Sequence, residues 1–315
     1  SGTILFVKKG NVILSDLKLS KSEIINYIKE FFVFVNPLII MSILVFISTM
    51  LDRWLIQKFY GSVEQAYFTI AQKISGVVFL LTSSALPLLQ RELSVEIKKD
   101  NKQNIKKLYY NYGQMLFILT SLFCIFICFN ASNIINLIGG KEYLQASIVL
   151  SIFSIYTVYR VKNQFCYIFL LSSEETKVIR NYTVIAYLVA IPLAYLLVAP
   201  ESLFGFGLGI SGLCIKLFII QHFLLIFISV RIDNKLKNSS NSIIINEFFI
   251  LFILSIIAIS IKSISVSILS SEYMQILLNG TSYFTISLII LFFFPRIFGL
   301  NPENIKMLSI LIKKR

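Results

Sequence analysis

The cationic side chains within the long apolar segments are the groups most able to do chemistry in this sequence. Five Lys or Arg residues lie inside such segments, whereas the Asp and Glu residues fall in loops or at segment ends. A Lys or Arg at the centre of a bilayer costs about 2.5–3.5 kcal/mol even on the lenient insertion scale, so it normally faces a cavity or a partner. The sequence therefore predicts a cavity for an anionic ligand. The five cations are Lys73, Arg160, Lys162, Lys216 and Lys262.

One of these cations belongs to a polar stripe. Residues spaced by three, four or seven lie on one face of an α-helix, and Tyr156, Arg160, Asn163 and Tyr167 keep this spacing. Lys162 comes two residues after Arg160, so it faces nearly the opposite side. We predict that the stripe lines a cavity, with structural pairing of its charge as the alternative.

Lys216 ends a second stripe, which three glycines form. Such a track suits either close helix packing or room for a ligand. Lys216 and Arg160 lie near the middle of their segments, where a side chain cannot easily snorkel to the interface. Lys162 and Lys262 lie nearer the segment ends, and Lys73 is intermediate. The glycines are Gly205, Gly209 and Gly212.

Other motifs carry little chemistry. Gly207-x-Gly209-x-x-Gly212 matches a dinucleotide fingerprint in letters only, because it opens an apolar helix that no strand precedes. His222 is the only histidine, which excludes a two-histidine metal site; a proton relay is the alternative to a plain polar role. We predict no catalytic residue, no metal, no cofactor and no enzymatic activity. The cysteines lack metal-ligand spacing and are Cys124, Cys128, Cys166 and Cys214.

The elements that must position these residues are membrane helices. Hydrophobic residues make up 57% of the 315 residues and charged residues 14%, against about 45–50% and 25% in soluble domains. A spanning helix needs about 20 apolar residues. We predict an all-α polytopic membrane helix bundle with about eight transmembrane helices. The stretches are 31–51, 66–90, 113–130, 144–171, 182–198, 205–230, 248–269 and 281–299.

The net charge of +13 reflects topology rather than nucleic-acid binding. Cytoplasmic loops of membrane proteins are rich in Lys and Arg, and every second connection here is basic. We therefore predict a protein in contact with membrane lipids, with both ends cytoplasmic and no nucleic-acid partner. The basic connections are 1–30, 91–112, 172–181, 231–247 and 300–315.

The order of apolar stretches and basic connections divides the chain into three parts. Residues 1–30 combine the apolar Ser1–Val7, which looks like the tail of a preceding helix, with a cytoplasmic amphipathic linker whose capping box begins at Ser20. Residues 31–230 hold six helices, and 231–315 hold two more and a basic tail. The expectation is that the chain is a fragment of a longer protein.

A run of short motifs crosses the first two apolar stretches. It consists of Pro37, Asp52-Arg53-Trp54, Gly61, Ala71-Gln72-Lys73-Ile74 and Pro87. This progression resembles the start of the C-terminal half of the polysaccharide (O-antigen) flippases in the multidrug/oligosaccharidyl-lipid/polysaccharide exporter superfamily. The glycine-rich run 207–213 is similar to the sixth helix of that half. The resemblance implies that 31–230 form a six-helix transport lobe and that 231–315 add the last two helices of fourteen-helix members.

The resemblance also implies a function. These flippases move an undecaprenyl-diphosphate-linked oligosaccharide, such as an O-antigen repeat unit, across the bacterial inner membrane by alternating access between two lobes. The diphosphate would meet cations, and the sugar would meet Tyr156, Asn163 and Tyr167. The implied partners are the lipid-linked oligosaccharide, a polysaccharide polymerase and a chain-length regulator. The implied diphosphate contacts are Arg53, Lys73, Arg160 and Lys216.

Three other classes stay open. An ion-coupled small-solute transporter is compatible with helices broken near Pro192 and the glycines. A multidrug exporter of the same superfamily would be expected to carry cavity carboxylates, and the sequence places none inside a span. A polysaccharide polymerase or lipid-linked glycosyltransferase would need a sizeable outer loop, and the predicted outer loops are short. A preceding part of the protein could also supply carboxylates to the buried cations.

Overall fold

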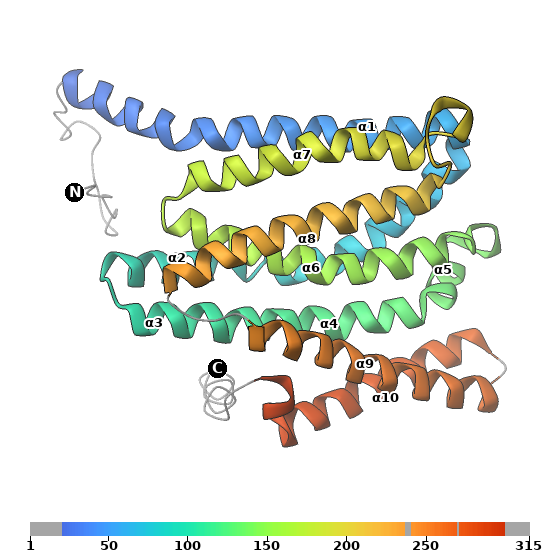
Figure 1. Cartoon of the computed structure of the whole chain (residues 1–315). Helices are drawn as coiled ribbons and strands as arrows, with labels where there is room; N and C mark the ends of the chain where they lie inside the picture. The colour runs from blue at the N-terminus through green and yellow to red at the C-terminus, as the bar shows by residue number, and fades with distance from the viewer. Residues whose placement is uncertain (1–20, 237–240, 270, 300–315) are drawn as a thin grey trace.

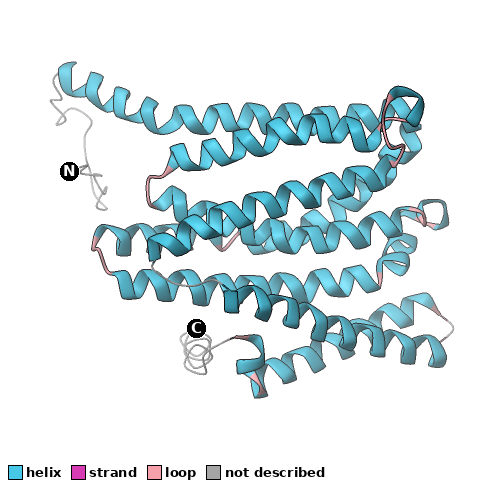
Figure 2. Cartoon of the chain, viewed as in Figure 1, coloured by secondary structure: helices cyan, strands magenta, loops and turns pink. Residues whose placement is uncertain are grey.

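The computed structural model describes residues 21–236, 241–269 and 271–299, and within them it is helical without strands (Figure 2), so the predicted all-α fold is confirmed. Ser1–Val7, Ser20 and the basic tail lie outside the described residues. The α-helices are α1 (Lys21–Ser83), α2 (Leu86–Lys98), α3 (Lys102–Lys107), α4 (Gly113–Phe129), α5 (Ala131–Gly139), α6 (Ala146–Ser172), α7 (Thr176–Val198), α8 (Gly209–Leu236), α9 (Asn241–Ile268) and α10 (Glu272–Phe293). A π-helical turn, Leu108–Tyr112, joins α3 to α4, and three short 3₁₀ turns are Lys141–Tyr143, Glu201–Leu203 and Pro295–Phe298.

Six helical stretches of the described chain are long and apolar enough to cross a membrane, and seven of the eight predicted segments lie wholly or largely within them. The first stretch holds both 31–51 and 66–90, because α1 continues between them through a kink at Gly61. Gly61 has a φ of 87°, which an L side chain rarely adopts. The remaining segment is α6, whose hydropathy is lowered by Arg160, Lys162, Asn163 and Gln164.

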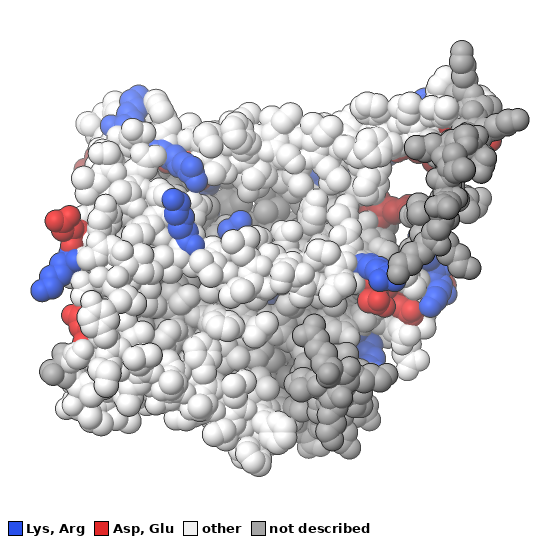
Figure 3. Space-filling model, turned by 180° about the vertical axis from the view of Figure 1, so that it is seen from behind, with Lys and Arg blue, Asp and Glu red and all other residues white. Residues whose placement is uncertain are grey.

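The connections predicted to alternate across the membrane lie at two opposite ends of the bundle. Figure 1 shows the α2–α3 and α6–α7 connections and the end of α8 at one end, and the bend of α1 and the α7–α8 and α9–α10 connections at the other. On the face in Figure 3, most acidic and many basic side chains gather toward these ends, with a largely uncharged belt between them. This is the pattern of a bundle that spans a membrane. The cytoplasmic placement of the first end stays a prediction, as does the division at residues 30 and 230.

Helix α6 lies at the centre of the packing. It contacts α1, α4 and α8 along its length, and α7 packs between α1 and α8. Phe153 and Phe169 mark the two ends of the core that α6 helps to form, and both are buried. Helices α9 and α10 pack on each other and against α4, where Phe117 and Tyr283 are fully buried. The central helix can therefore bring its polar stripe to the interior of the bundle.

An ion-pair network ties α7 to α8 where α8 ends. Glu175, just before α7, accepts hydrogen bonds from Arg231 Nε at 3.1 Å and from Lys235 Nζ at 2.6 Å. Partial burial raises the pKa of Glu175, but the hydrogen bonds and positive charges of these two residues outweigh it and hold the pKa below its ordinary value. The pairs are half-exposed, and such pairs contribute at most about 1 kcal/mol each.

The glycine stripe that leads to Lys216 serves close packing. A Cβ on Gly212 would lie 2.5 Å from the carbonyl oxygen of Leu197 on α7, and one on Gly205 would lie 2.0 Å from that of Ala199. Neither distance is open to a real side chain, because the obstructing atoms are backbone. Tight helix packing is therefore confirmed at Gly212. Gly205 lies in the connection before α8, which begins at Gly209, so the prediction that it continues the helical stripe is wrong.

We expect Gly212→Ala to destabilise the protein by about 1–3 kcal/mol, the usual cost of overpacking a close contact. Gly76→Ala is the matched control, because Gly76 is also helical and a Cβ there meets nothing within 4 Å. This second change should be neutral or stabilising, since alanine is the better helix former. Thermal unfolding in detergent compares the two variants. Equal unfolding temperatures would contradict the close contact between α7 and α8.

Candidate functional site

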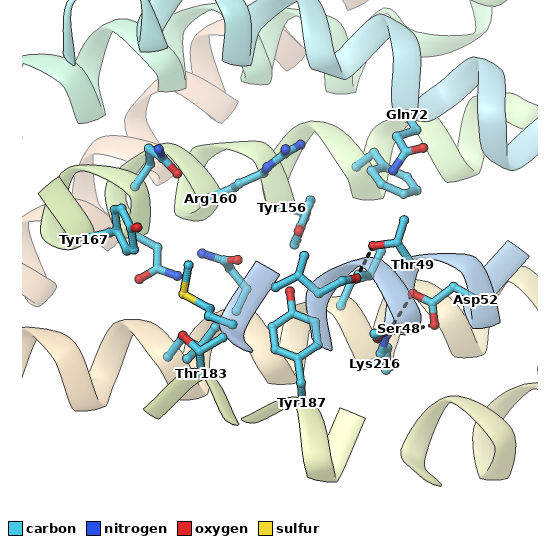
Figure 4. A pocket seen from close by; sticks show the side chains of 18 of the residues that line it. Ser48, Thr49, Asp52, Gln72, Tyr156, Arg160, Tyr167, Thr183, Tyr187 and Lys216 are labelled. Carbon is cyan, nitrogen blue, oxygen red and sulfur yellow. Dashed lines mark hydrogen bonds and ion pairs between the residues drawn. The ribbon is translucent and has the colours of Figure 1, made fainter. Parts of the chain in front are cut away.

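A polar pocket of about 460 Å³ lies among α1, α6, α7 and α8. Figure 4 shows its labelled side chains converging from these helices on a common space. Four helices of a membrane bundle thus surround a cavity that carries amide, hydroxyl, phenol and charged groups. Cavities between the helices of a bundle are common ligand sites.

The α6 stripe forms one wall of this pocket. Tyr156, Arg160, Asn163 and Tyr167 all line it, so the cavity predicted from their spacing is confirmed. Figure 4 shows Tyr156, Arg160 and Tyr167 along the same helix. Lys162 does not line the pocket, as expected from its helical phase.

Arg160 is the notable charge of the pocket. Its guanidinium lies over the ring of Phe79, with 4.0 Å from Cζ to the ring centroid. It is half-buried, and none of the ion pairs among the described residues involves it. Cation–π contact stabilises such a group by about 0.5–2 kcal/mol but leaves its charge uncompensated.

Lys216 also lines the pocket, but it has a carboxylate partner. Its Nζ lies 2.8 Å from both carboxylate oxygens of Asp52 and 3.1 Å from Oγ of Ser48. Lys216 and Asp52 are 2% and 6% exposed. An ammonium has three hydrogens, so these three acceptors can occupy all of them. The structure therefore shows Lys216 in a structural ion pair and not as a free charge in the cavity.

The prediction that no carboxylate lies inside the bundle is therefore wrong. The sequence placed Asp52 just after the stretch 31–51, at the end of a predicted segment. Helix α1 instead continues to Gly61 before it kinks, which leaves Asp52 inside the packed bundle beside α8. Adjacent helical residues point in different directions, so Arg53 faces elsewhere and donates from Nη2 to Oε1 of Gln72 at 3.3 Å.

Lys162 and Lys262 have partners of their own. Lys162 forms an ion pair with Glu247 of α9, a second carboxylate that the prediction had placed outside the spans. Lys262 donates to the carbonyl oxygen of Phe129 at 2.6 Å. Both lysines thus connect α9 to α4 or α6. Neither is a candidate for ligand binding in this arrangement.

Two predicted diphosphate contacts lie outside the pocket. Lys73 is exposed and does not line it. Arg53 does not line it either, but its hydrogen-bond partner Gln72 does. Of the four predicted cations, the structure brings Arg160 and Lys216 into the pocket and leaves Arg53 and Lys73 at its margin or beyond.

Several pocket residues were not predicted. Gln164 lies on α6 next to the stripe, and Thr183 and Tyr187 reach the pocket from α7. The i, i+4 spacing of Thr183 and Tyr187 was visible in the sequence. It was weak as a signal, because two polar residues in a helix do not show which neighbour they face. The further polar residues are Ser48, Thr49, Gln72 and Gln221.

The described part of the chain holds no cluster of metal-binding side chains, and its histidine lies outside the pocket. No group of three or more His, Cys, Asp or Glu side chains there could hold a metal ion. His222 does not line the pocket; its Nδ1 lies 2.9 Å from the carbonyl oxygen of Phe218, and its ring stacks on that phenyl ring.

Comparison with known protein families gives a match within the first two thirds of the chain. The model of the MatE family matches residues 37–196, a little more than half of the chain. The matched region includes the α6 stripe and Asp52 but ends before Lys216. No curated protein and no solved structure matches significantly.

Proposed function

The chain belongs to the MatE family of the multidrug/oligosaccharidyl-lipid/polysaccharide exporter superfamily, whose members are membrane transporters, and we propose that it moves an anionic, lipid-linked cargo. The cargo we favour is an undecaprenyl-diphosphate-linked oligosaccharide such as an O-antigen repeat unit. In this proposal the pocket takes up the diphosphate and the first sugars by alternating access. The observation that carries the proposal is Arg160, a pocket cation without a carboxylate partner among the described residues.

The charge balance of the pocket supports an anion. Its charged lining residues are Asp52, Arg160 and Lys216, and the first and last neutralise each other. One positive charge is left over in a site with reduced access to water. A guanidinium presents a planar fork of donors that matches phosphate oxygens, so a phosphate is the ligand that would satisfy it best.

The rest of the lining supports a sugar. Tyr156 and Tyr167 flank Arg160 along α6, and Asn163 and Gln164 add amide groups beside them. The side-chain oxygen of Asn163 is buried without a hydrogen-bond partner in the structure. Aromatic faces and unsatisfied amides suit the apolar and hydroxyl sides of a carbohydrate.

The other predicted contacts take different roles in this proposal. Lys216 has its hydrogen-bonding capacity occupied by Asp52 and Ser48, so it would reach a diphosphate only after that pair separates. Arg53 and Lys73 would steer the approaching cargo by their charge, because they lie outside the pocket. Arg160 is thus the main diphosphate contact.

A multidrug exporter of the same family is the second candidate. Asp52 supplies the carboxylate that such a protein is expected to carry, and the sequence alone had placed none there. Tyr156, Tyr167 and Tyr187 could hold a planar organic cation. To bind there, however, a cation would have to compete with Lys216 for Asp52. It would also be repelled by the positive charge of Arg160.

Transport by the complete protein in proteoliposomes separates the two candidates. The test lipids are a fluorescent polyprenyl-diphosphate-linked sugar and a matched polyprenyl-linked sugar without the diphosphate, and the third substrate is a cationic dye. We expect movement of the diphosphate lipid and little movement of the neutral lipid or the dye. Export of the dye without movement of the diphosphate lipid would establish the multidrug candidate and overturn the proposal.

A further inference from the structure

The α7–α8 loop, residues 199–208, exposes a cluster of large apolar side chains at one end of the bundle. Phe204 is 94% exposed and Phe206 is 65% exposed, and Leu203 and Leu208 beside them are exposed as well. Figure 1 shows the loop next to the bend of α1, at the end opposite the α2–α3 and α6–α7 connections. A contiguous apolar patch on a protein surface marks contact with a membrane or with another protein.

The backbone of this loop is folded and satisfied. Every amide nitrogen from residue 203 to residue 208 donates a hydrogen bond within the chain. Those of Phe206, Gly207 and Leu208 reach back to carbonyl oxygens at the C-terminal end of α7, at 2.7–3.0 Å. Lipid offers no acceptor to a backbone amide, so a segment that enters a membrane must satisfy its donors internally. The α7–α8 loop meets this requirement where its apolar side chains lie.

Phe204 holds its ring outward through an unusual backbone conformation. Its φ and ψ are 61° and 25°, in the left-handed region. Glycine and asparagine are the usual residues there, and a bulky side chain is an outlier. Strain of this kind is retained where the surrounding structure imposes it, and it is concentrated at functional positions. The strained residue is also the most exposed phenylalanine of the loop, which points to a role for its ring outside the bundle.

The exposed cluster continues into aromatic residues of α1 and α7. The hydroxyl of Tyr195 donates to the carbonyl oxygen of Leu203 at 3.1 Å, and its ring lies 6.4 Å from that of Phe59 between centroids. Lys58 Nζ lies over the rings of Trp54 and Phe59, at 4.4 and 5.6 Å from their centroids. Tyrosine and tryptophan are enriched where a membrane meets water, and lysine extends its ammonium toward the headgroups.

The same surface continues along the membrane-spanning helices. Leu196, whose carbonyl oxygen accepts the hydrogen bond from Phe206, is itself exposed on α7. Leu188 and Val189 are exposed further along that helix, and Met50 is exposed on α1. Both helices belong to stretches that are long and apolar enough to cross a membrane. The loop cluster is therefore the end of an apolar helix surface rather than an isolated patch, and this continuity favours lipid as its partner.

We propose that the α7–α8 loop is an interfacial anchor that inserts Phe204 and Phe206 into the lipid leaflet at its end of the bundle. The loop backbone lies at the level of the headgroups, beside Trp54 and Tyr195, and Lys58 faces the lipid phosphates. Anchoring fixes the depth of the α7–α8 pair, which supplies part of the pocket wall. This inference concerns lipid contact alone and does not rest on the proposed cargo.

Nitroxide labels on the complete protein in lipid nanodiscs test the anchor. The four cysteines are replaced by alanine, and one label is attached to Phe204→Cys or, in a separate protein, to Phe206→Cys. Power saturation compares collisions with molecular oxygen, which concentrates in lipid, and with a water-soluble nickel chelate. Ser202→Cys is the matched control, because Ser202 is an exposed polar residue of the same loop. We expect a several-fold higher ratio of oxygen to chelate collisions at both phenylalanine positions than at Ser202.

Two results would overturn the proposal. Labels at Phe204 and Phe206 that collide with the chelate as often as the Ser202 label place the loop in water. Immobilised labels that are shielded from both reagents show that another part of the protein covers the loop. If the cysteine-free protein does not fold, Phe204→Trp combined with Trp54→Phe leaves a single tryptophan. Brominated lipids should quench its fluorescence, and quenching by aqueous iodide instead would count against the anchor.

Discussion

We expect Arg160→Ala to slow movement of the diphosphate lipid by about 30-fold or more while the protein remains folded in the membrane. The expected size follows from truncating one partner of a buried charge pair with a bound phosphate, which costs about 2–5 kcal/mol. The fold should tolerate the change, because Arg160 is half-buried and, among the described residues, its guanidinium contacts the ring of Phe79 and forms no ion pair. Transport in proteoliposomes and protein level in the membrane are measured together.

Two further variants make this result specific. Arg160→Lys keeps the charge but loses the planar fork, so we expect partial activity. Arg180→Ala removes an arginine of α7 that lies outside the pocket and bonds only to Asn181 among the described residues, and it should transport normally. Wild-type transport by Arg160→Ala would show that the pocket cation does not bind the cargo.

Breaking the pair between Asp52 and Lys216 on one side should destabilise the protein by about 3–5 kcal/mol, because an unpaired charge is left buried. Lys216→Met leaves the carboxylate alone, and Asp52→Asn leaves the ammonium alone. The double variant removes both charges and should recover most of the stability. Thermal or denaturant unfolding of the four proteins gives the interaction free energy of the double-mutant cycle.

The double variant also separates two roles for Lys216. If the Asp52→Asn, Lys216→Met protein folds and transports, the pair is structural, as its geometry indicates. If it folds but does not move the cargo, Lys216 contacts the diphosphate in another conformation. Additive losses of stability from the two single changes would contradict the ion pair itself.

The sequence was informative wherever the physical signal is local. The spacing of Tyr156, Arg160 and Tyr167 placed them on one helix face, because the period of an α-helix is fixed, and that face does line the pocket. The long apolar segments predicted the helices, since a bilayer requires both their length and their composition. The same helical phase kept Lys162 out of the pocket.

The sequence did not predict which charged side chains of different segments pair with each other. The run of apolar residues predicted that the first stretch ends at Leu51, although α1 runs on to the kink at Gly61. That single boundary made Asp52 look like a residue of the membrane surface. The start of the stretch 248–269 excluded Glu247 in the same way. The functional inference drawn from these boundaries, that no acid accompanies the buried cations, was wrong for Lys162 and Lys216.

By itself, the sequence determined a membrane helix bundle and a polar stripe with Arg160 at its centre. Only the tertiary structure decided which cations keep a free charge. Asp52 and Lys216 are 164 positions apart, and Lys162 and Glu247 are 85 apart. Helical periodicity fixes the direction of a side chain around its own axis, but it contains no information about the helix that faces it. The net charge left for a ligand depends on which acidic and basic side chains of different helices pair with each other. It is therefore fixed only when the helices have packed.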